Sequence, residues 1–174
     1  TLCNAKIIEP IGNNDYKPSV ARWNMATEEI NPMPYEYPDL KKVRFIYAAS
    51  AEHQLYVQCY TQYDLMTICD FNGNLKCNIY GPKWVNEKTQ TQHYSLGVEF
   101  CGDKILALYS GGDHRTDAYY PTKFLVFDLN GNYLKTLETG YMITDFCYDK
   151  ENNRLIINLN DEIQFAYLDL EGII

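Results

Sequence analysis

A short motif that occurs three times constrains the fold of this chain most strongly. Each copy reads apolar, apolar, Asp, apolar, polar, Gly. The copies occupy residues 68–76, 126–134 and 167–172. The pattern indicates a strand that runs into a tight hairpin, where Asn-Gly supplies the positive φ angles of a type I′ turn. We expect Asp70, Asp128 and Asp169 to accept hydrogen bonds from backbone amides of these turns.

Each copy of the motif belongs to a longer unit with strand-like segments, here called A to D in chain order. The units span 43–80, 94–138 and 142–174, and the last stops after its third strand. A period of roughly 40 to 45 residues with four strands per unit is typical of β-propeller blades. A sandwich or an irregular barrel remains the alternative, because such folds also place a strand every ~8–12 residues.

The predicted fold class is therefore all-β, a β-propeller of four-stranded antiparallel blades. The chain covers about three and a half blades of a larger ring. It divides into a partial blade with a long connection (1–42), a blade with a long D–A loop (43–93), a blade with a B–C insertion (94–141) and an incomplete last blade (142–174). Because propellers close with roughly four to eight blades, we expect the remaining blades to come from missing chain.

The first 40 residues are less regular, because five prolines interrupt them. Residues 2–8 and 20–25 are predicted to be strands. Proline cannot donate a hydrogen bond to a sheet, so 32–38 is predicted to be a loop or an edge.

The composition supports β structure and narrows the choice of partners. The 16 tyrosines favour a pleated, half-buried surface. The net charge of −8 argues against nucleic acid, because the chain has no basic stripe to replace the counterions of phosphates. No apolar run approaches the length of ~18 residues that a membrane-spanning helix needs, so we expect no membrane-spanning segment.

The six cysteines show neither CxxC nor CxH spacing, so no metal site is predicted. Most lie in strand-like runs, where Cys behaves as a small apolar residue, and we expect unpaired core thiols. Cys69 and Cys77 lie symmetrically about Gly73 and are the best candidates if a disulfide exists. No phosphate-binding loop or hydrolase motif occurs, so no cofactor and no standard enzyme class is indicated.

Two long loops mark where a ligand would bind. In a blade of alternating strands, the B–C and D–A connections emerge at one end, so the D–A loop 81–93 and the B–C insertion 110–121 should lie together. The candidate ligand-binding residues are Trp84, Glu87, His93, Asp113, His114, Arg115, Asp117, Tyr119 and Tyr120. The aromatic members are expected either to stack on a sugar ring or partner side chain, or to staple the loops to the blade edge. His53 falls in an A–B turn at the opposite end and is interpreted as structural.

The loop carboxylates allow two chemical interpretations, a metal site and a catalytic pair. Asp113, His114 and Asp117 are of the types that hold divalent metals, but their spacing matches no recognised loop, and we interpret them as solvated turn residues. Glu87 with Asp113 or Asp117 is the combination that a glycoside-cleaving pair would use. Acidic loop residues are more commonly plain surface, so no catalytic residue is assigned.

The segment 127–135, followed by a new first strand and by 149–155, resembles the six-bladed TolB-like or NHL-like propellers. The resemblance covers about 43–174 and is nearest in style to those of gut Bacteroidetes, many of them uncharacterised lipoproteins of the cell envelope. It implies export to the periplasm or the outer-membrane surface, with lipid anchoring through a missing N-terminus as an open option. It brings no catalytic set, because the blade motifs are shared across functions.

The sequence thus leads to two functional hypotheses. The first is a non-catalytic binding or scaffolding propeller whose ligand is a protein, a peptide or a glycan. The alternative is a carbohydrate-active envelope enzyme that uses loop carboxylates on the same face. Acidic residues that face one another around the propeller axis would favour the enzyme, and a flat aromatic loop surface would favour the binder.

Overall fold

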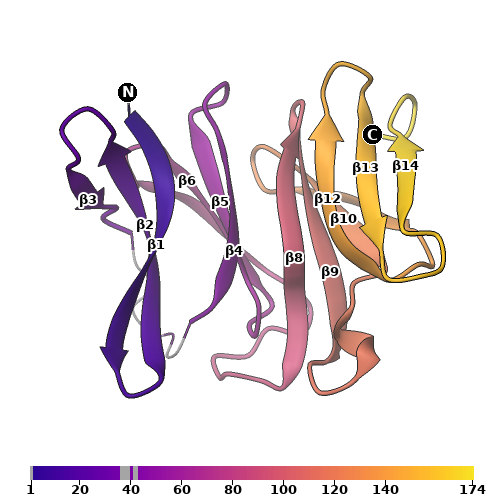
Figure 1. The fold of residues 1–174 in the computed structure, drawn as a ribbon, viewed down its shortest axis with the longest axis horizontal. Coiled ribbons are helices and arrows are strands. Elements are labelled where there is room, and N and C mark those ends of the chain that lie inside the picture. The colour runs from indigo at the N-terminus through magenta and orange to yellow at the C-terminus, as the bar shows by residue number, and fades with distance from the viewer. Residues whose placement is uncertain (1, 36–39, 41–42) are drawn as a thin grey trace.

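The computed structural model describes residues 2–35, 40 and 43–174, and strands dominate this part of the chain. They form four antiparallel sheets that stand side by side (Figure 1). The first sheet contains β1 (Leu2–Gly12), β2 (Asp15–Asn24) and β3 (Ile30–Pro32). The second contains β4 (Phe45–Ser50), β5 (Leu55–Tyr60), β6 (Leu65–Asp70) and β7 (Leu75–Tyr80). The third contains β8 (Thr91–Cys101), β9 (Lys104–Asp113), β10 (Lys123–Asp128) and β11 (Tyr133–Glu138). The fourth contains β12 (Ile143–Asp149), β13 (Arg154–Leu159) and β14 (Phe165–Asp169).

Every sheet is a meander, because each strand pairs with the strand that precedes it in the chain. Neighbouring sheets meet along their first strands, where β4 contacts β8 and β8 contacts β12 (Figure 1). The first sheet joins the second through Lys6 of β1, whose Nζ donates a hydrogen bond to the carbonyl oxygen of Phe45 in β4. Antiparallel meanders that share an inner edge in this way are blades of a β-propeller, and the predicted fold class is confirmed.

The second sheet is buried on both faces. All six residues of β5 and five of the six residues of β6 are buried. Val57 packs with Ile105 in the core shared with the third sheet, whereas Tyr56 packs with Val20 in the core shared with the first. Strands covered on both sides carry continuous apolar runs instead of strict alternation, which explains the sequence of β5 and β6.

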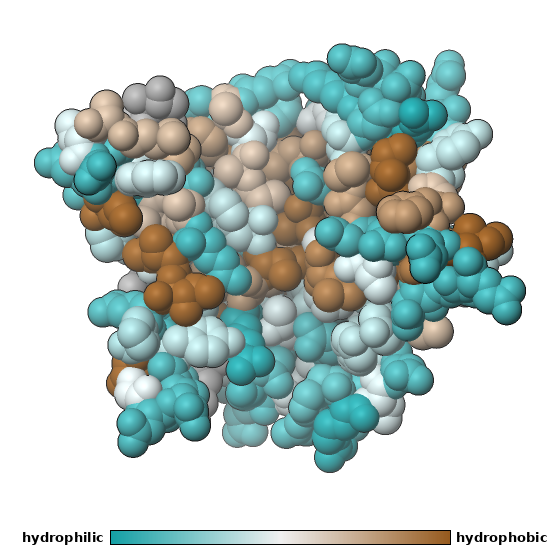
Figure 2. Space-filling view, in the orientation of Figure 1, coloured by the Kyte–Doolittle hydropathy of each residue, from teal (hydrophilic) through white to brown (hydrophobic). Residues whose placement is uncertain are grey.

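The third and fourth sheets share a separate core. Leu106 and Phe124 of the third sheet pack against Phe146 and Leu155 of the fourth, and the rings of Phe124 and Phe146 meet edge to face with centroids 4.9 Å apart. Figure 2 shows apolar side chains across the middle of the face seen in Figure 1, while hydrophilic side chains dominate its lower end. The loops that follow β7 and β9 lie at that lower end.

The recurring aspartate anchors its turn as predicted. Asp128 Oδ1 accepts hydrogen bonds from the backbone N–H groups of Asn130 and Asn132, at 2.8 and 2.9 Å, and Oδ2 accepts one from the Asn132 side chain at 2.8 Å. Asp70 makes the same set of bonds in its own turn. Asp169 accepts one of them, from the backbone of Glu171. The bonds from Asn132 hold the pKa of Asp128 below its usual value.

The predicted turn type is wrong. A type I′ turn needs positive φ at both central residues, but in these Asn-Gly pairs only Gly73 (φ +82°) and Gly131 (φ +86°) are positive. The N–H of Gly73 bonds to the carbonyl of Asp70 at 3.0 Å, and the register shifts between Ile68 and Cys69. This is a type I turn followed by a glycine bulge, a geometry that the aspartate stabilises by bonding to the turn amides.

The register of β6 with β7 separates the two cysteines that were the best disulfide candidates. All six cysteines are free. Cys69 lies opposite Leu75 and belongs to the core facing the first sheet, whereas Cys77 lies opposite Ile68 and packs on the core facing the third. Their side chains therefore lie on different faces of the second sheet, which no disulfide geometry bridges.

Some strand boundaries also differ from the prediction. β1 runs to Gly12 and β2 begins at Asp15, so both are longer than expected, and β4 begins at Phe45 instead of Val43. Pro32 ends the edge strand β3, and part of the segment predicted as loop or edge (36–38) lies outside the described residues. No helix in the described ranges is long and apolar enough to span a membrane.

We predict that Gly73→Ala destabilises the fold more than Gly172→Ala. Both glycines have positive φ, which costs an L-residue about 1–2 kcal/mol. A Cβ at Gly73 would lie only 2.3 Å from Cδ of Pro34, whereas a Cβ at Gly172 meets nothing within 4 Å. Overpacking should add about 1–3 kcal/mol at Gly73 alone. Urea unfolding of both variants measures the difference, and equal losses of stability would contradict the packing described for this turn.

Candidate functional site

The two long loops meet at one end of the second and third sheets, as the strand directions require. His114 of the second loop contacts the carbonyl oxygen of Gln90 in the first, through both its backbone N–H (3.1 Å) and its Nδ1 (2.9 Å). Lys83 of the first loop donates from Nζ to the carbonyl oxygen of Gly111 in the second, at 3.4 Å. The loops are therefore joined to each other as well as to their own blades.

The aromatic candidates divide into two groups. Trp84 packs against Tyr80 and Tyr63, with ring centroids 4.9 and 6.3 Å apart, so it staples its loop to the second sheet. Tyr119 and Tyr120 stack on each other with centroids 4.2 Å apart at the end of a short 3₁₀ helix, Asp117–Tyr119. They are half-buried, which leaves ring surface open to solvent.

The loop carboxylates do not form a reactive pair. Asp113 binds the guanidinium of Arg115 through both oxygens, at 3.0 and 2.6 Å, and this pairing holds the pKa of Asp113 well below its usual range. A general acid of a glycosidase requires the opposite shift. Glu87 is exposed, and Asp117 begins the 3₁₀ helix. No group of three or more His, Cys, Asp or Glu side chains among the described residues is arranged to hold a metal ion.

The sequence predicted His93 in a surface loop, but the structure places it elsewhere. It lies within β8 and is only 1% exposed. Its Nδ1 is 3.7 Å from Oδ1 of Asp64 and 3.3 Å from the hydroxyl of Tyr109, and its Nε2 is buried without a hydrogen-bond partner. The residue is therefore part of a buried polar cluster behind the loops.

An irregularity in β8 produces this placement. The pairing of β8 with β9 shifts register on both sides of Tyr94, and Leu96 adopts a positive φ of 66°. Gly97 follows, and a Cβ there would lie 2.7 Å from the ring of Phe146. Such bulges re-aim side chains and are common beside functional sites. Here the bulge follows the beginning of the strand, which carries His93 and Tyr94 into the interior.

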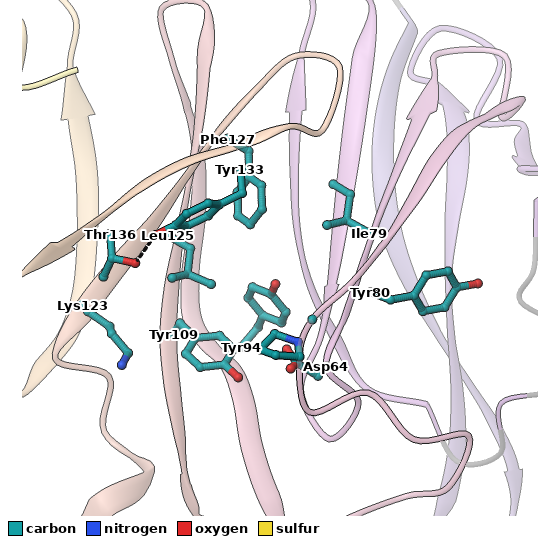
Figure 3. A pocket seen from close by; sticks show the side chains of 12 residues that line it. Asp64, Ile79, Tyr80, Tyr94, Tyr109, Lys123, Leu125, Phe127, Tyr133 and Thr136 are labelled. Atoms are coloured by element: carbon teal, nitrogen blue, oxygen red, sulfur yellow. Dashed lines mark hydrogen bonds between the residues drawn. The ribbon is translucent and has the colours of Figure 1, made fainter.

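A pocket of about 340 Å³ lies between the second and third sheets at the bases of the two loops (Figure 3). Its walls come from β7 on one side and from β8, β9, β10 and β11 on the other. Most of the lining is aromatic or aliphatic: Ile79, Tyr80, Pro82, Tyr94, Tyr109, Leu125, Phe127 and Tyr133. Gly81 and three polar residues, Asp64, Lys123 and Thr136, complete it. In Figure 3 the Tyr80 ring points away from the other side chains.

Asp64 is the buried polar residue of this pocket and is only 1% exposed. Its Oδ2 accepts a hydrogen bond from the backbone N–H of Lys83 at 2.9 Å, and its backbone carbonyl accepts one from Gly81 at 2.8 Å. A Cβ at Gly81 would lie 2.2 Å from the Asp64 carboxyl carbon, so glycine allows the loop backbone to pass directly over this group. Burial, with the carboxyl of Asp64 close by, raises the pKa of Tyr109 well above its usual value.

Asp64 was not among the predicted site residues, because candidates were sought in the long loops. Asp64 lies in the short connection between β5 and β6. The sequence does single out Asp64 in one respect, because it is the one charged residue between two otherwise apolar strand runs. A buried carboxyl in that position needs a hydrogen-bond partner and therefore marks a place where another segment must approach.

The inner strands carry a second feature that loop analysis did not single out. Glu99 of β8 is half-buried, and burial together with the nearby charge of Asp145 on β12 raises the pKa of Glu99. These carboxylates lie on first strands of adjacent sheets, which is where acidic residues around the propeller axis would be found.

Burial makes the stability of the fold depend on the charge of His93. Desolvation by burial lowers the pKa of His93 from its ordinary value of 6.5 and outweighs the opposing charge of Asp64, while the positive charge of Lys83 adds to the lowering. The unfolded chain therefore takes up a proton at a higher pH than the folded chain, so stability present above 6.5 is lost as the pH falls below it.

We predict that His93→Gln flattens this acid dependence. Unfolding free energies from urea titrations between about pH 8 and about pH 5 should fall more steeply for the natural chain than for the variant. The unfolding free energy near pH 8, where histidine is neutral in both states, serves as the reference for any stability that the variant loses through poorer packing. Equal slopes would contradict a buried, neutral His93.

No family model matches the chain, and no curated protein matches it. Solved structures of the β-propeller class do. The chain is similar to the extracellular domain assigned to a hybrid two-component system of Bacteroides thetaiotaomicron (TM-score 0.61, 11% identity), to a chain of a nidogen/laminin complex (0.59, 12%) and to BamB from Moraxella catarrhalis (0.53, 14%). The matches cover 94%, 87% and 86% of this chain but only 19%, 52% and 38% of the others. The chain thus spans about half or less of the length of these propellers, and the likeness concerns the fold alone.

Proposed function

We propose that the chain is a non-catalytic binding or scaffolding part of a bacterial cell-envelope β-propeller, and that its ligand is a protein, a peptide or a glycan. The observation that carries this proposal is the pocket between the second and third sheets. Concave, mostly apolar sites with a few convergent polar groups are where proteins commonly hold ligands. The pocket lining includes Gly81 and Pro82 at the base of the first long loop and Lys123 shortly after the second, so a ligand seated in it lies next to both loop bases.

The scaffold around the pocket supports binding more than catalysis. The walls come from strands that are fixed in two packed sheets, and the polar groups at the loop bases are held by hydrogen bonds across the loops. Function placed on loops above a rigid scaffold is a common arrangement. Of the predicted binding residues, Tyr119, Tyr120 and Arg115 offer exposed or half-exposed surface on the second loop.

The proposal of an envelope location rests on two similarities to other proteins. The sequence resembles TolB-like or NHL-like six-bladed propellers of Bacteroidetes, and one structural neighbour is an extracellular domain from Bacteroides thetaiotaomicron. We propose that the protein is exported to the periplasm or the outer-membrane surface, that further blades complete its ring, and that lipid anchoring upstream is one way of retaining it there.

A carbohydrate-active enzyme is the second candidate, and one observation favours it. The pair Glu99 and Asp145 combines a carboxyl of raised pKa with a nearby carboxylate, the combination that acid–base cleavage of glycosides uses. The loop carboxylates first considered for this role are less suitable, because Asp113 is engaged by Arg115.

Glycan and peptide arrays probed with the full chain test the proposed function. We expect one ligand class to bind, and we expect Tyr133→Ala to weaken that binding, because this ring lines the pocket and is 57% exposed. Tyr167→Ala is the matched control, since Tyr167 is 67% exposed and does not line this pocket.

The same ligands serve for a hydrolysis assay of the natural chain and of Glu99→Gln. Cleavage that Glu99→Gln abolishes would replace the binding proposal by the enzyme. Absence of both binding and cleavage would contradict both candidates.

A further inference from the structure

We infer that the pocket between the second and third sheets binds a single neutral sugar ring, as the terminal or protruding unit of a glycan. This rests on the proposed binding function and names the ligand class for the same site. The inference comes from three properties of the pocket: the chemistry of its walls, the opposite character of its polar groups, and its size.

Aromatic rings line the walls of the pocket. They come from β10 and β11, which form the outer hairpin of the third sheet, and from β8 and β9. Phe127 and Tyr133 meet edge to face with centroids 6.0 Å apart, and Tyr94 and Tyr109 do so at 5.2 Å. Thr136 holds the Tyr133 ring in place, because the two hydroxyl groups are 2.8 Å apart (Figure 3). The C–H faces of a pyranose ring pack on aromatic surfaces of this kind, and few rotatable bonds have to be fixed when the rings are already oriented.

The polar groups of the pocket are opposite in character. Asp64 supplies carboxyl oxygens that accept hydrogen bonds, and the ammonium group of Lys123 supplies donors. Lys123 lies over the face of Tyr109, with Nζ 5.8 Å from the ring centroid, and is also 3.7 Å from Glu138. Lys123 would repel a cationic ligand, and Asp64 would repel an anionic ligand. A neutral polyhydroxylated ring suits both groups, since each hydroxyl donates and accepts.

Asp64 is held in place before any ligand arrives. The backbone N–H of Lys83 binds one carboxyl oxygen, the backbone of Gly81 lies against the group, and His93 stands 3.7 Å from the other oxygen. A buried acceptor with a fixed direction gives orientation and specificity to a site whose walls are otherwise non-directional.

The volume of about 340 Å³ fits one ring and not a chain of several. It lies near the lower end of the range of ~300–1,000 Å³ in which proteins hold small molecules. The rest of a glycan would therefore extend out of the pocket.

Isothermal titration of the full chain with methyl glycosides tests this inference. The probes are the neutral methyl pyranosides of glucose, galactose, mannose and N-acetylglucosamine, with choline and N-acetyl-lysine methyl ester as cationic comparisons. At least one glycoside should bind, and Tyr133→Ala should weaken it by roughly fivefold through loss of one packed ring. Tyr167→Ala should leave the affinity unchanged. Asp64→Asn should weaken binding by about tenfold or more, because a charged hydrogen-bond acceptor is replaced by a neutral amide.

Tyr133 is exposed, so its variant keeps the test valid if Asp64→Asn does not fold. Binding of a cationic probe that depends on Tyr133, without binding of any glycoside, would overturn the inference. So would glycoside binding that neither variant weakens. If array peptides bind through Tyr133 while glycosides do not, the sugar inference fails and the proposed binding function stands. If no probe and no array ligand binds, both fail.

Discussion

The packing of one sheet against the next is the interaction on which the rest of the structure depends. A single antiparallel meander of four short strands has two faces, and in the second sheet both are apolar. Such a sheet is stable only when neighbours cover both sides. The first and third sheets do this through Val20 and Ile105, which belong to two separate cores. Repetition of the blade is therefore a physical requirement of these strand sequences.

The same packing creates the pocket. The second and third sheets contact each other along β4, β5 and β8, while their outer strands enclose open space. One end of that space is closed by the turn anchored on Asp128: Lys76 and Cys77 of β7 bond to the carbonyl oxygens of Leu129 and Asn130 there. A Cβ at Gly131 would lie 2.8 Å from Ile79, so the motif glycine permits this close approach. The repeated motif thus shapes the site as well as the blade.

Much of the fold was predictable because its signals are local. Strand-like runs and Asp-x-x-Gly turns are readable within about ten residues, and their recurrence at a period of roughly 40 to 45 residues led correctly to antiparallel blades. The two long connections do meet at one end, but β8 and β9 extend into the predicted loops 81–93 and 110–121. The turn type was not predicted correctly, although the hydrogen bonds of Asp70 to the turn amides were, because Asn-Gly fits both a type I′ turn and a type I turn followed by a glycine bulge. The disulfide candidates failed because Cys77 lies opposite Ile68, the neighbour of Cys69, and successive side chains of a strand point to different faces.

The candidate site was predictable only in part. The loops gave its general position, but its buried members depend on contacts between segments far apart in the chain. His93 reaches the interior because β8 bulges at Leu96, and Asp64 becomes part of a pocket because a glycine lets the next loop cross it. Neither event has a periodic sequence signal. Polar residues that interrupt apolar strand runs are the clue to seek in other blades.

Methyl chemical-shift mapping by NMR tests most directly the claim that the space between two packed sheets is the ligand site. The chain would be labelled at isoleucine and leucine methyl groups and titrated with the ligand that the arrays select. The account predicts that the methyl signals of Ile79 and Leu125, which line the pocket from opposite sheets, shift together and saturate with the binding curve. Saturating binding that leaves both signals unmoved would place the ligand elsewhere and contradict the account.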